Sequence, residues 1–143
     1  MKNITFLIVT CLTLTILLSG CNIAVTPAND EDAIRSVIQK FALALNDQDW
    51  NEAKSYCVYE SERYYAICQM EDMVNTLYSY CNLITINVLV DIYDVSVNGN
   101  YGQVYGHVVI LLTACGAYES TDAYGYYYLQ KVGNNWKIYE SGL

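Results

Sequence analysis

Residues 81–115, CNLITINVLVDIYDVSVNGNYGQVYGHVVILLTAC, decide the fold. Before Cys81 the apolar residues recur at helical spacing, whereas after it they alternate along the chain, which is the period of a half-buried strand. The triplet Asn98-Gly99-Asn100 is a turn signal, and a second run rich in β-branched residues follows from about 102 to 115. The stretch therefore predicts two long strands joined as a hairpin.

Two registers of this hairpin are open, and they place one pair of side chains differently. In the first, Asp91 lies opposite His107 and Tyr93 lies opposite Tyr105. In the second, a two-residue Asn98-Gly99 turn shifts the pairing by one residue and separates Asp91 from His107, since neighbouring side chains point to opposite faces. Only the first register creates an acid–imidazole pair among tyrosines.

Two further strands are predicted after the hairpin. They cover about 122–132 and 136–139, and the turn Gly133-Asn134 joins them. Alternation places Tyr124, Tyr126 and Tyr128 on one face of the third strand and Tyr127 on the other.

Three helices are predicted before the hairpin. The first covers about 31–45, with Asn29 or Asp30 as its N-cap, and Asp49 followed by Glu52 opens a short second helix. The third covers about 68–80, while residues 58–66 are ambiguous. Its predicted apolar stripe is Met70, Met73, Val74, Leu77 and Cys81. Helices followed by strands predict an α+β domain, with three N-terminal helices packed on a curved antiparallel sheet of about four strands.

The N-terminus predicts export and lipidation. Residues 1–20 read as a signal peptide, because Lys2 precedes an apolar run over residues 4–18 and small residues follow. Leu18-Ser19-Gly20-Cys21 resembles the lipobox of bacterial lipoproteins, which implies a lipid on Cys21 and a domain anchored outside a membrane in the cell envelope. The alternative, an uncleaved transmembrane anchor, needs about 20 apolar residues, more than this run supplies. Residues 21–29 then form the lipidated cysteine and a spacer, and residues 30–143 form the domain.

Charge and composition limit the partners. The chain carries seven Lys and Arg against fifteen Asp and Glu, a net charge of −8. A nucleic-acid partner is excluded, since phosphate binding needs clustered cations. The fifteen tyrosines suit half-exposed surfaces, either as sheet margins or as a binding face.

Four cysteines of the domain predict two disulfides in an exported protein. If Asp91 pairs with His107, residue 83 lies opposite Cys115, and Cys81 is within its reach. Cys57 and Cys68 are the remaining pair, between the second and third helices. The alternative is four buried thiols in a reducing compartment.

Two segments resemble the nuclear transport factor two-like (NTF2-like) superfamily, which includes ketosteroid isomerase-like and cystatin-like domains. They are AIRSVIQKFALALNDQDWNEAKSYC at 33–57 and YYYLQKVGNNWKIYE at 126–140. The resemblance implies a cone of three helices against a bent sheet, often with a pocket. It leaves function open, because this fold hosts enzymes, transport factors and non-catalytic modules.

The sequence contains few chemical motifs. His107 is the only histidine, and neither HExxH nor CxxC occurs, so we expect no metal and no cofactor. The favoured function is non-catalytic binding of a small apolar ligand or an envelope protein. The expected surface is Tyr93, Tyr105, Tyr124, Tyr126 and Tyr128. The alternative is a small isomerase or hydrolase that uses Asp91, His107 and tyrosines.

Overall fold

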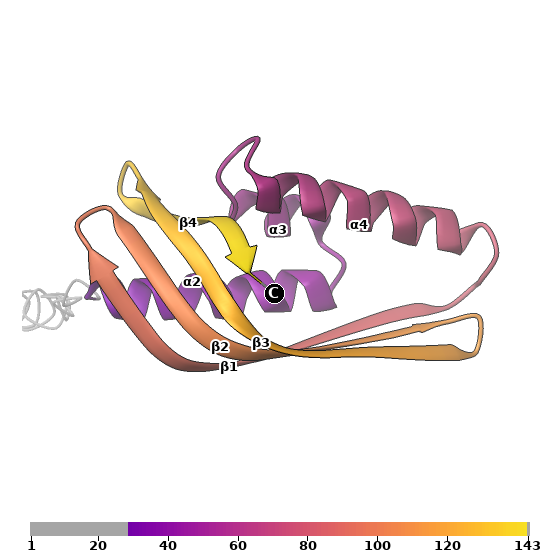
Figure 1. Cartoon of the computed structure of the whole chain (residues 1–143). Helices are drawn as coiled ribbons and strands as arrows, with labels where there is room; N and C mark the ends of the chain where they lie inside the picture. Colours follow the sequence, from indigo (N-terminus) through magenta and orange to yellow (C-terminus); the bar gives the residue numbers. More distant parts are fainter. Residues whose placement is uncertain (1–28, 143) are drawn as a thin grey trace, which may run out of the picture.

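The computed structural model describes residues 29–142, which form three helices followed by four strands (Figure 1). The helices are α2 (Asp30–Asn46), α3 (Trp50–Ser55) and α4 (Glu62–Tyr78). The strands are β1 (Ile84–Asn98), β2 (Tyr101–Ala114), β3 (Ala117–Val132) and β4 (Asn135–Gly142). They form one antiparallel sheet in the order β1-β2-β3-β4. The predicted α+β architecture is confirmed.

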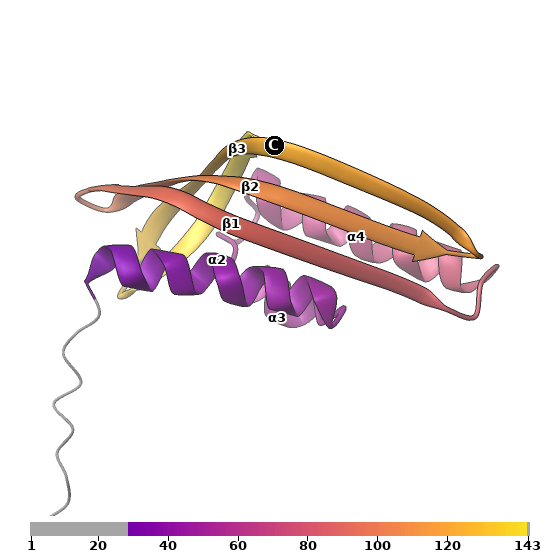
Figure 2. The same ribbon diagram turned by 90° about the horizontal axis from the view of Figure 1, so that it is seen from below.

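The sheet is bent, and its two ends differ in what lies beside them. The first residues of α2 lie at the same end as the β1–β2 and β3–β4 turns (Figure 1). The β2–β3 turn and the connection from α4 to β1 lie at the opposite end, as the rotated view also shows (Figure 2). We call these the α2 end and the far end.

The core lies between the helices and one face of the sheet, here called the inner face. Ile38 and Phe41 of α2 are buried together with Val104, Leu129 and Ile138 from β2, β3 and β4. Each such side chain contributes about 1.5–3 kcal/mol on burial. Hydrophobic burial therefore determines which sheet face the helices cover.

Helix α4 begins earlier than the predicted start at about residue 68. Ser61 is its N-cap, and its hydroxyl accepts a hydrogen bond from the Tyr64 amide at 3.2 Å. Most of the predicted stripe is confirmed, because Val74 and Cys81 are buried and Met70 and Leu77 pack against the core. Met73 is wrong, since it is exposed, and the buried Ile67 was missed. The first turn lacks apolar periodicity, which is why the sequence left it ambiguous.

The β1–β2 register pairs Asp91 with His107, as the first predicted register requires. The turn differs from both predictions, since Asn98 pairs with Tyr101 across Gly99-Asn100. A β-bulge between Ile92 and Asp94 then shifts the register by one residue and restores the predicted pairing. Consequently Asp94 lies opposite Tyr105, and the predicted pairing of Tyr93 with Tyr105 is wrong.

Both edges of the sheet are covered by neighbouring chain. On β1, the Asn46 amide group hydrogen-bonds the backbone N–H and C=O of Val88, and Gln48 Nε2 donates to the Ile84 carbonyl at 3.0 Å. On β4, the Val58 amide donates to the Ile138 carbonyl, and the Ile138 amide donates to the Tyr56 carbonyl, both at 2.8 Å. These contacts occupy backbone groups that edge strands otherwise expose.

Only one of the two predicted disulfides is present. Cys81 and Cys115 are bonded, with their Cα atoms 5.0 Å apart, and they join the connection between α4 and β1 to the β2–β3 turn. Cys57 and Cys68 are free, so the predicted Cys57–Cys68 bond is wrong for this structure. The Cys57 thiol is buried and donates to the Ala53 carbonyl, and burial raises its pKa to about 11, which disfavours the thiolate that disulfide formation needs.

The predicted signal peptide, the lipidation site Cys21 and most of the spacer lie outside the described residues. Asn29, the last spacer residue, is the N-cap of α2 and accepts a hydrogen bond from the Asp32 amide at 2.8 Å. Within residues 29–142, no helix is long and apolar enough to cross a membrane.

Candidate functional site: an outer tyrosine face and a cleft

The predicted surface tyrosines lie on the face of the sheet that points away from the core. Tyr124 and Tyr126 are 61% and 41% exposed, whereas Tyr127 between them is 1% exposed and belongs to the core. The predicted alternation along β3 is therefore confirmed. We define the outer tyrosine face as Tyr93, Tyr105, Tyr124, Tyr126, Tyr128 and Tyr139.

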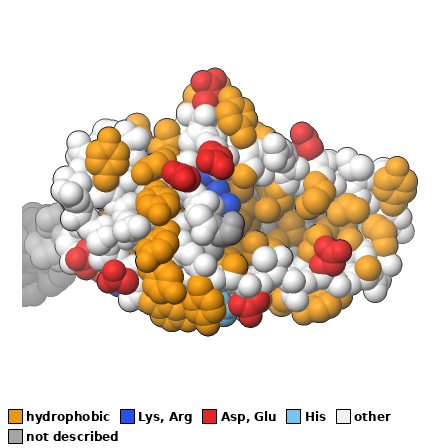
Figure 3. Space-filling view, in the orientation of Figure 1, with side chains coloured by type: hydrophobic (Ala, Val, Ile, Leu, Met, Phe, Trp, Pro, Cys, Tyr) orange, Lys and Arg blue, Asp and Glu red, His pale blue; other side chains and the backbone are white. Residues whose placement is uncertain are grey.

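Their rings contact one another in a row across the strands. Tyr93 stacks on Tyr124 with ring centroids 6.3 Å apart, and Tyr105 lies 5.0 Å from Tyr126. Tyr126 in turn lies 6.2 Å from Tyr128, and the row continues onto β4. Such spacings are typical of favourable aromatic pairs. Figure 3 shows this row as hydrophobic side chains that end beside the pale-blue histidine.

His107 lies at one end of the row between two carboxylates. Its Nε2 is 2.6 Å from Asp122 Oδ1, its Nδ1 is 3.8 Å from Asp91 Oδ2, and its ring stacks on Tyr124 with centroids 4.4 Å apart. The predicted Asp91–His107 pair is thus present, on an open surface where the Asp91 side chain is 75% exposed. Asp122 was not singled out, because the sequence placed the start of the third strand at about that residue, whereas β3 begins at Ala117.

Carboxylates border the outer tyrosine face. Four acidic residues pair with, or lie beside, its members across the strands: Asp91, Asp94, Asp122 and Glu140. Desolvation, followed by the neighbouring Tyr124 and Asp91, raises the pKa of Tyr93, so its hydroxyl stays protonated to a higher pH than that of an ordinary tyrosine. The face is therefore aromatic and neutral at its centre and negative around it.

A cleft lies on the other side of the sheet, between α4 and the far end. Its volume is about 390 Å³. The lining residues are Met73, Leu77, Leu112, Ala114, Cys115, Ala117 and Glu119. This lining is mostly apolar, which suits a hydrophobic ligand.

Arg63 lies on α4 toward the α2 end. Its guanidinium carbon is 5.1 Å from the Phe41 ring centroid and 5.6 Å from that of Tyr127. Its Nη1 donates to Ser141 Oγ at 3.0 Å, while its Nε is buried without a partner among the described residues. No sequence pattern indicated this site, because its members come from four separate elements, α2, α4, β3 and β4.

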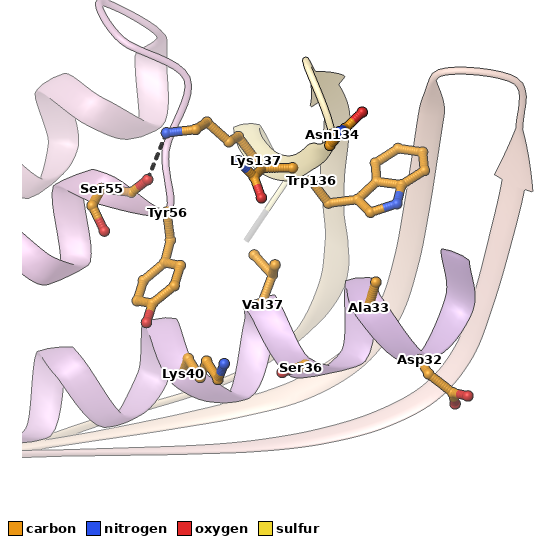
Figure 4. A pocket seen from close by; sticks show the side chains of 11 residues that line it. Asp32, Ala33, Ser36, Val37, Lys40, Ser55, Tyr56, Asn134, Trp136 and Lys137 are labelled. Atoms are coloured by element: carbon orange, nitrogen blue, oxygen red, sulfur yellow. Dashed lines mark hydrogen bonds between the residues drawn. The ribbon is translucent and has the colours of Figure 1, made fainter. Parts of the chain in front are cut away.

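A second groove lies between α2, the end of α3 and the β3–β4 turn (Figure 4). Lys137 crosses it and donates to the Ser55 carbonyl at 2.8 Å. Nearby, Asp30 Oδ1 accepts hydrogen bonds from Lys131 Nζ at 2.7 Å and Trp136 Nε1 at 2.9 Å. These two donors lower the pKa of Asp30. These contacts join α2 and α3 to the β3–β4 hairpin.

Within the described part of the chain, no three His, Cys, Asp or Glu side chains are arranged to hold a metal ion. The structure thus gives the tyrosine row, the acid–imidazole group and the cleft as the features available for binding or catalysis.

The architecture matches solved structures of cone-shaped α+β domains. A conserved protein from Planctomyces limnophilus superposes with a TM-score of 0.63 at 16% identity, covering 78% of this chain and 92% of that chain. An NTF2-like protein with a cystatin-like fold from Novosphingobium aromaticivorans gives 0.60 at 16% identity, covering 78% and 79%. A ketosteroid isomerase-like protein from Erwinia carotovora atroseptica gives 0.62 at 10% identity, covering 79% and 93%.

The fold of this chain is therefore the NTF2-like, ketosteroid isomerase-like fold, as the two quoted segments predicted. The sequence matches no protein-family model and no curated protein. Structural similarity at identities this low establishes the fold alone, and the function has to be argued from the surface of this chain.

Proposed function

We propose that this chain is a lipid-anchored binding domain of the cell envelope, and that its outer tyrosine face binds a protein partner with basic residues. The anchor is inferred from the lipobox at Leu18–Cys21. The binding role is inferred from the outer tyrosine face, and this face is the observation that carries the proposal.

The composition of the face supports a protein partner. Tyrosine offers a large contact area with few rotatable bonds, which limits the entropy lost on binding. Tyr124 is the most exposed ring in the row, and no described helix covers this side of the sheet. An aromatic surface left open to this extent is typical of an interaction site.

The charge of the partner is inferred from the border of the face. Asp91 and Asp122 are 75% and 67% exposed, so their carboxylates are available to a partner. Arg and Lys side chains can pair with such carboxylates and stack on tyrosine rings in the same contact. A basic segment therefore complements both parts of the surface.

Catalysis by Asp91 and His107 is less well supported. A catalytic pair works best in a site that excludes water. Here both aspartates beside His107 are mostly exposed, and the imidazole lies on an open sheet face. The isomerase or hydrolase is therefore the alternative. A turnover activity that is lost in His107→Ala would favour it over the binding role.

The anchor and the face are tested separately. Mass spectrometry of the chain from a bacterial envelope should find an acylated Cys21 at the N-terminus, and an intact Met1 would refute the anchor. For the face, partners crosslinked in the envelope are quantified with the unaltered chain and with Tyr124→Ala/Tyr126→Ala. The control is Tyr59→Ala/Tyr65→Ala, which removes two exposed tyrosines near and within α4.

The expected result is one partner lost in the outer-face variant, retained in the control, and weakened by salt because its charges are exposed. Equal capture by both variants refutes the proposal. Sedimentation of the purified chain adds a second test: self-association lost in Tyr124→Ala/Tyr126→Ala would assign the face to a second copy instead.

A second candidate function is the binding of a small apolar ligand in the cleft between α4 and the far end. The apolar walls formed by Met73, Leu77 and Leu112 favour it. A neutral probe such as 1-decanol tests it directly, and Leu112→Glu should abolish the binding. Absence of binding by 1-decanol would refute this second candidate.

A further inference from the structure

We infer that a hollow at the α2 end of the outer sheet face binds the ammonium group of a lysine side chain from the protein partner. The inference rests on the proposed function, whose partner is basic, and it names the side chain that this partner inserts. Four observations carry it: the construction of the hollow, the rings that line it, its polar oxygen atoms and its charge.

The hollow has a volume of about 360 Å³ and lies beside the β1–β2 turn. A β-bulge on β4 builds one side of it, because Tyr128 pairs with Glu140 while Leu129 pairs with Ile138. In a bulge two residues of one strand oppose one residue of the other, so Tyr139 and Glu140 both lie opposite Tyr128. The side chains that line the hollow come from all four strands: Ser96, Asn98, Tyr101, Gln103, Tyr128 and Tyr139.

Three tyrosine rings line the hollow. The Tyr128 and Tyr139 rings have centroids 6.2 Å apart, and their planes are inclined by 40°. Tyr101 supplies the third ring and is 58% exposed, so it is open to a partner. The face of an aromatic ring attracts a cation that lies within about 6 Å of its centroid. The three rings thus form an aromatic cage for a cation.

The shape and the polar atoms of the cage favour an ammonium over a guanidinium. Ser96, Asn98 and Gln103 each bring a side-chain oxygen that can accept a hydrogen bond. An ammonium carries three N–H donors around one compact centre, which suits acceptors on several sides. A guanidinium is planar and stacks on parallel ring faces, whereas the Tyr128 and Tyr139 rings are inclined.

The protein supplies no cation to the cage. Neither Lys nor Arg is among the described residues that line it. The two lysines of β3 and β4 are used elsewhere, since Lys131 pairs with Asp30 at 2.7 Å and Lys137 donates to the Ser55 carbonyl at 2.8 Å. The positive charge that suits these rings must therefore come from a partner.

A carboxylate lies beside the cage. Glu140 is exposed, and it contributes to the raised pKa of Tyr139 after desolvation and before Tyr101 and Tyr128. Its negative charge therefore acts on the Tyr139 ring, and a carboxylate in this position also attracts an ammonium. The cage and its border together complement a lysine.

The experiment titrates the purified chain with Nα-acetyl-lysine methylamide and with the Nε-acetylated form of this probe, which has the same stem and no charge. NMR shifts of the tyrosine ring resonances report both the affinity and the place of binding. We expect the charged probe to bind about tenfold more tightly, because a cation that is partly desolvated among aromatic rings gains roughly this factor. The largest shifts should occur at Tyr101, Tyr128 and Tyr139, and the corresponding arginine probe should bind more weakly.

The variants change the cage and leave the rest of the outer tyrosine face intact. Tyr101→Leu keeps an apolar side chain but removes the ring, so it should abolish the preference for the charged probe. Tyr101→Phe keeps the ring and should retain the preference. The matched control is Tyr118→Leu, which removes a tyrosine that is 66% exposed near the start of β3. The NMR spectrum of each variant shows that it is folded.

Three outcomes overturn the inference: equal affinities of the two lysine probes for the unaltered chain, a preference that survives Tyr101→Leu, or an equal loss in Tyr118→Leu. Tighter binding of the arginine probe would overturn the assignment to lysine. The proposed function fails separately, through equal partner capture by its outer-face and control variants. If capture is lost as expected and the charged probe shows no preference, only this inference fails.

Discussion

Removal of the Cys81–Cys115 bond by Cys81→Ala/Cys115→Ala should destabilise the domain by an amount that follows from the loop it closes. The two residues are 34 positions apart. In the chain-entropy description, a loop of this length lowers the entropy of the unfolded chain by about 13 cal/mol/K, or about 3.8 kcal/mol at 25 °C. For a domain of this size that is a fall in melting temperature of about 15 °C.

The assay is thermal and urea unfolding of the oxidised chain and of the double variant, followed by circular dichroism. Reductant should shift the unaltered chain toward the variant and leave the variant unchanged, because the two free cysteines, Cys57 and Cys68, make no bond to reduce. A difference below about 1 kcal/mol would show that the bond does not restrict the unfolded chain as reasoned. An equal effect of reductant on the variant would show that another bond exists.

Three further predictions concern single residues. Asp30→Asn should destabilise the domain at neutral pH. Because Lys131 lowers the pKa of Asp30 below its ordinary value of 3.8, the difference in unfolding free energy between the two chains should persist at pH values above 3.8. It should vanish as the Asp30 carboxyl of the unaltered chain is protonated at lower pH, and unfolding at several pH values measures this. Gly106→Ala should destabilise by about 1–3 kcal/mol, since a Cβ there would lie 2.7 Å from the Asp91 carbonyl oxygen, and unchanged urea midpoints would contradict this. Cys57 should resist iodoacetamide at pH 8 in the folded chain, since burial raises its pKa to about 11, and modification as fast as in urea would refute its protection.

The sheet was predictable because its signals are local and repeated. Alternation placed Tyr127 on the opposite face of the strand from Tyr124, since side-chain direction has a period of two residues, but it did not specify which of the two faces is buried. The Asp91–His107 pair was predicted for an incomplete reason: the turn differs from both predicted turns, and the bulge at Tyr93 offsets the difference. A bulge leaves little trace in a β-branched run.

The sites that need distant residues were not predictable in the same way. Arg63 lies in a segment without apolar periodicity, and its environment forms only when Phe41, Tyr127 and Ser141 converge on it. Similarly, Asp122 reaches His107 because β3 begins before residue 122. Sequence patterns specify which face a side chain points to, but they do not specify which distant side chains meet there.

The contacts at the edges of the sheet have a consequence for how copies of this chain meet one another. An open strand edge would invite the stacking of copies into fibrils. Asn46 and Gln48 occupy backbone groups of β1, and residues 56–58 occupy those of β4. At these positions neighbouring copies can meet only through side chains, where contacts are weaker and reversible, so a concentrated population of this chain is protected from edge-to-edge assembly.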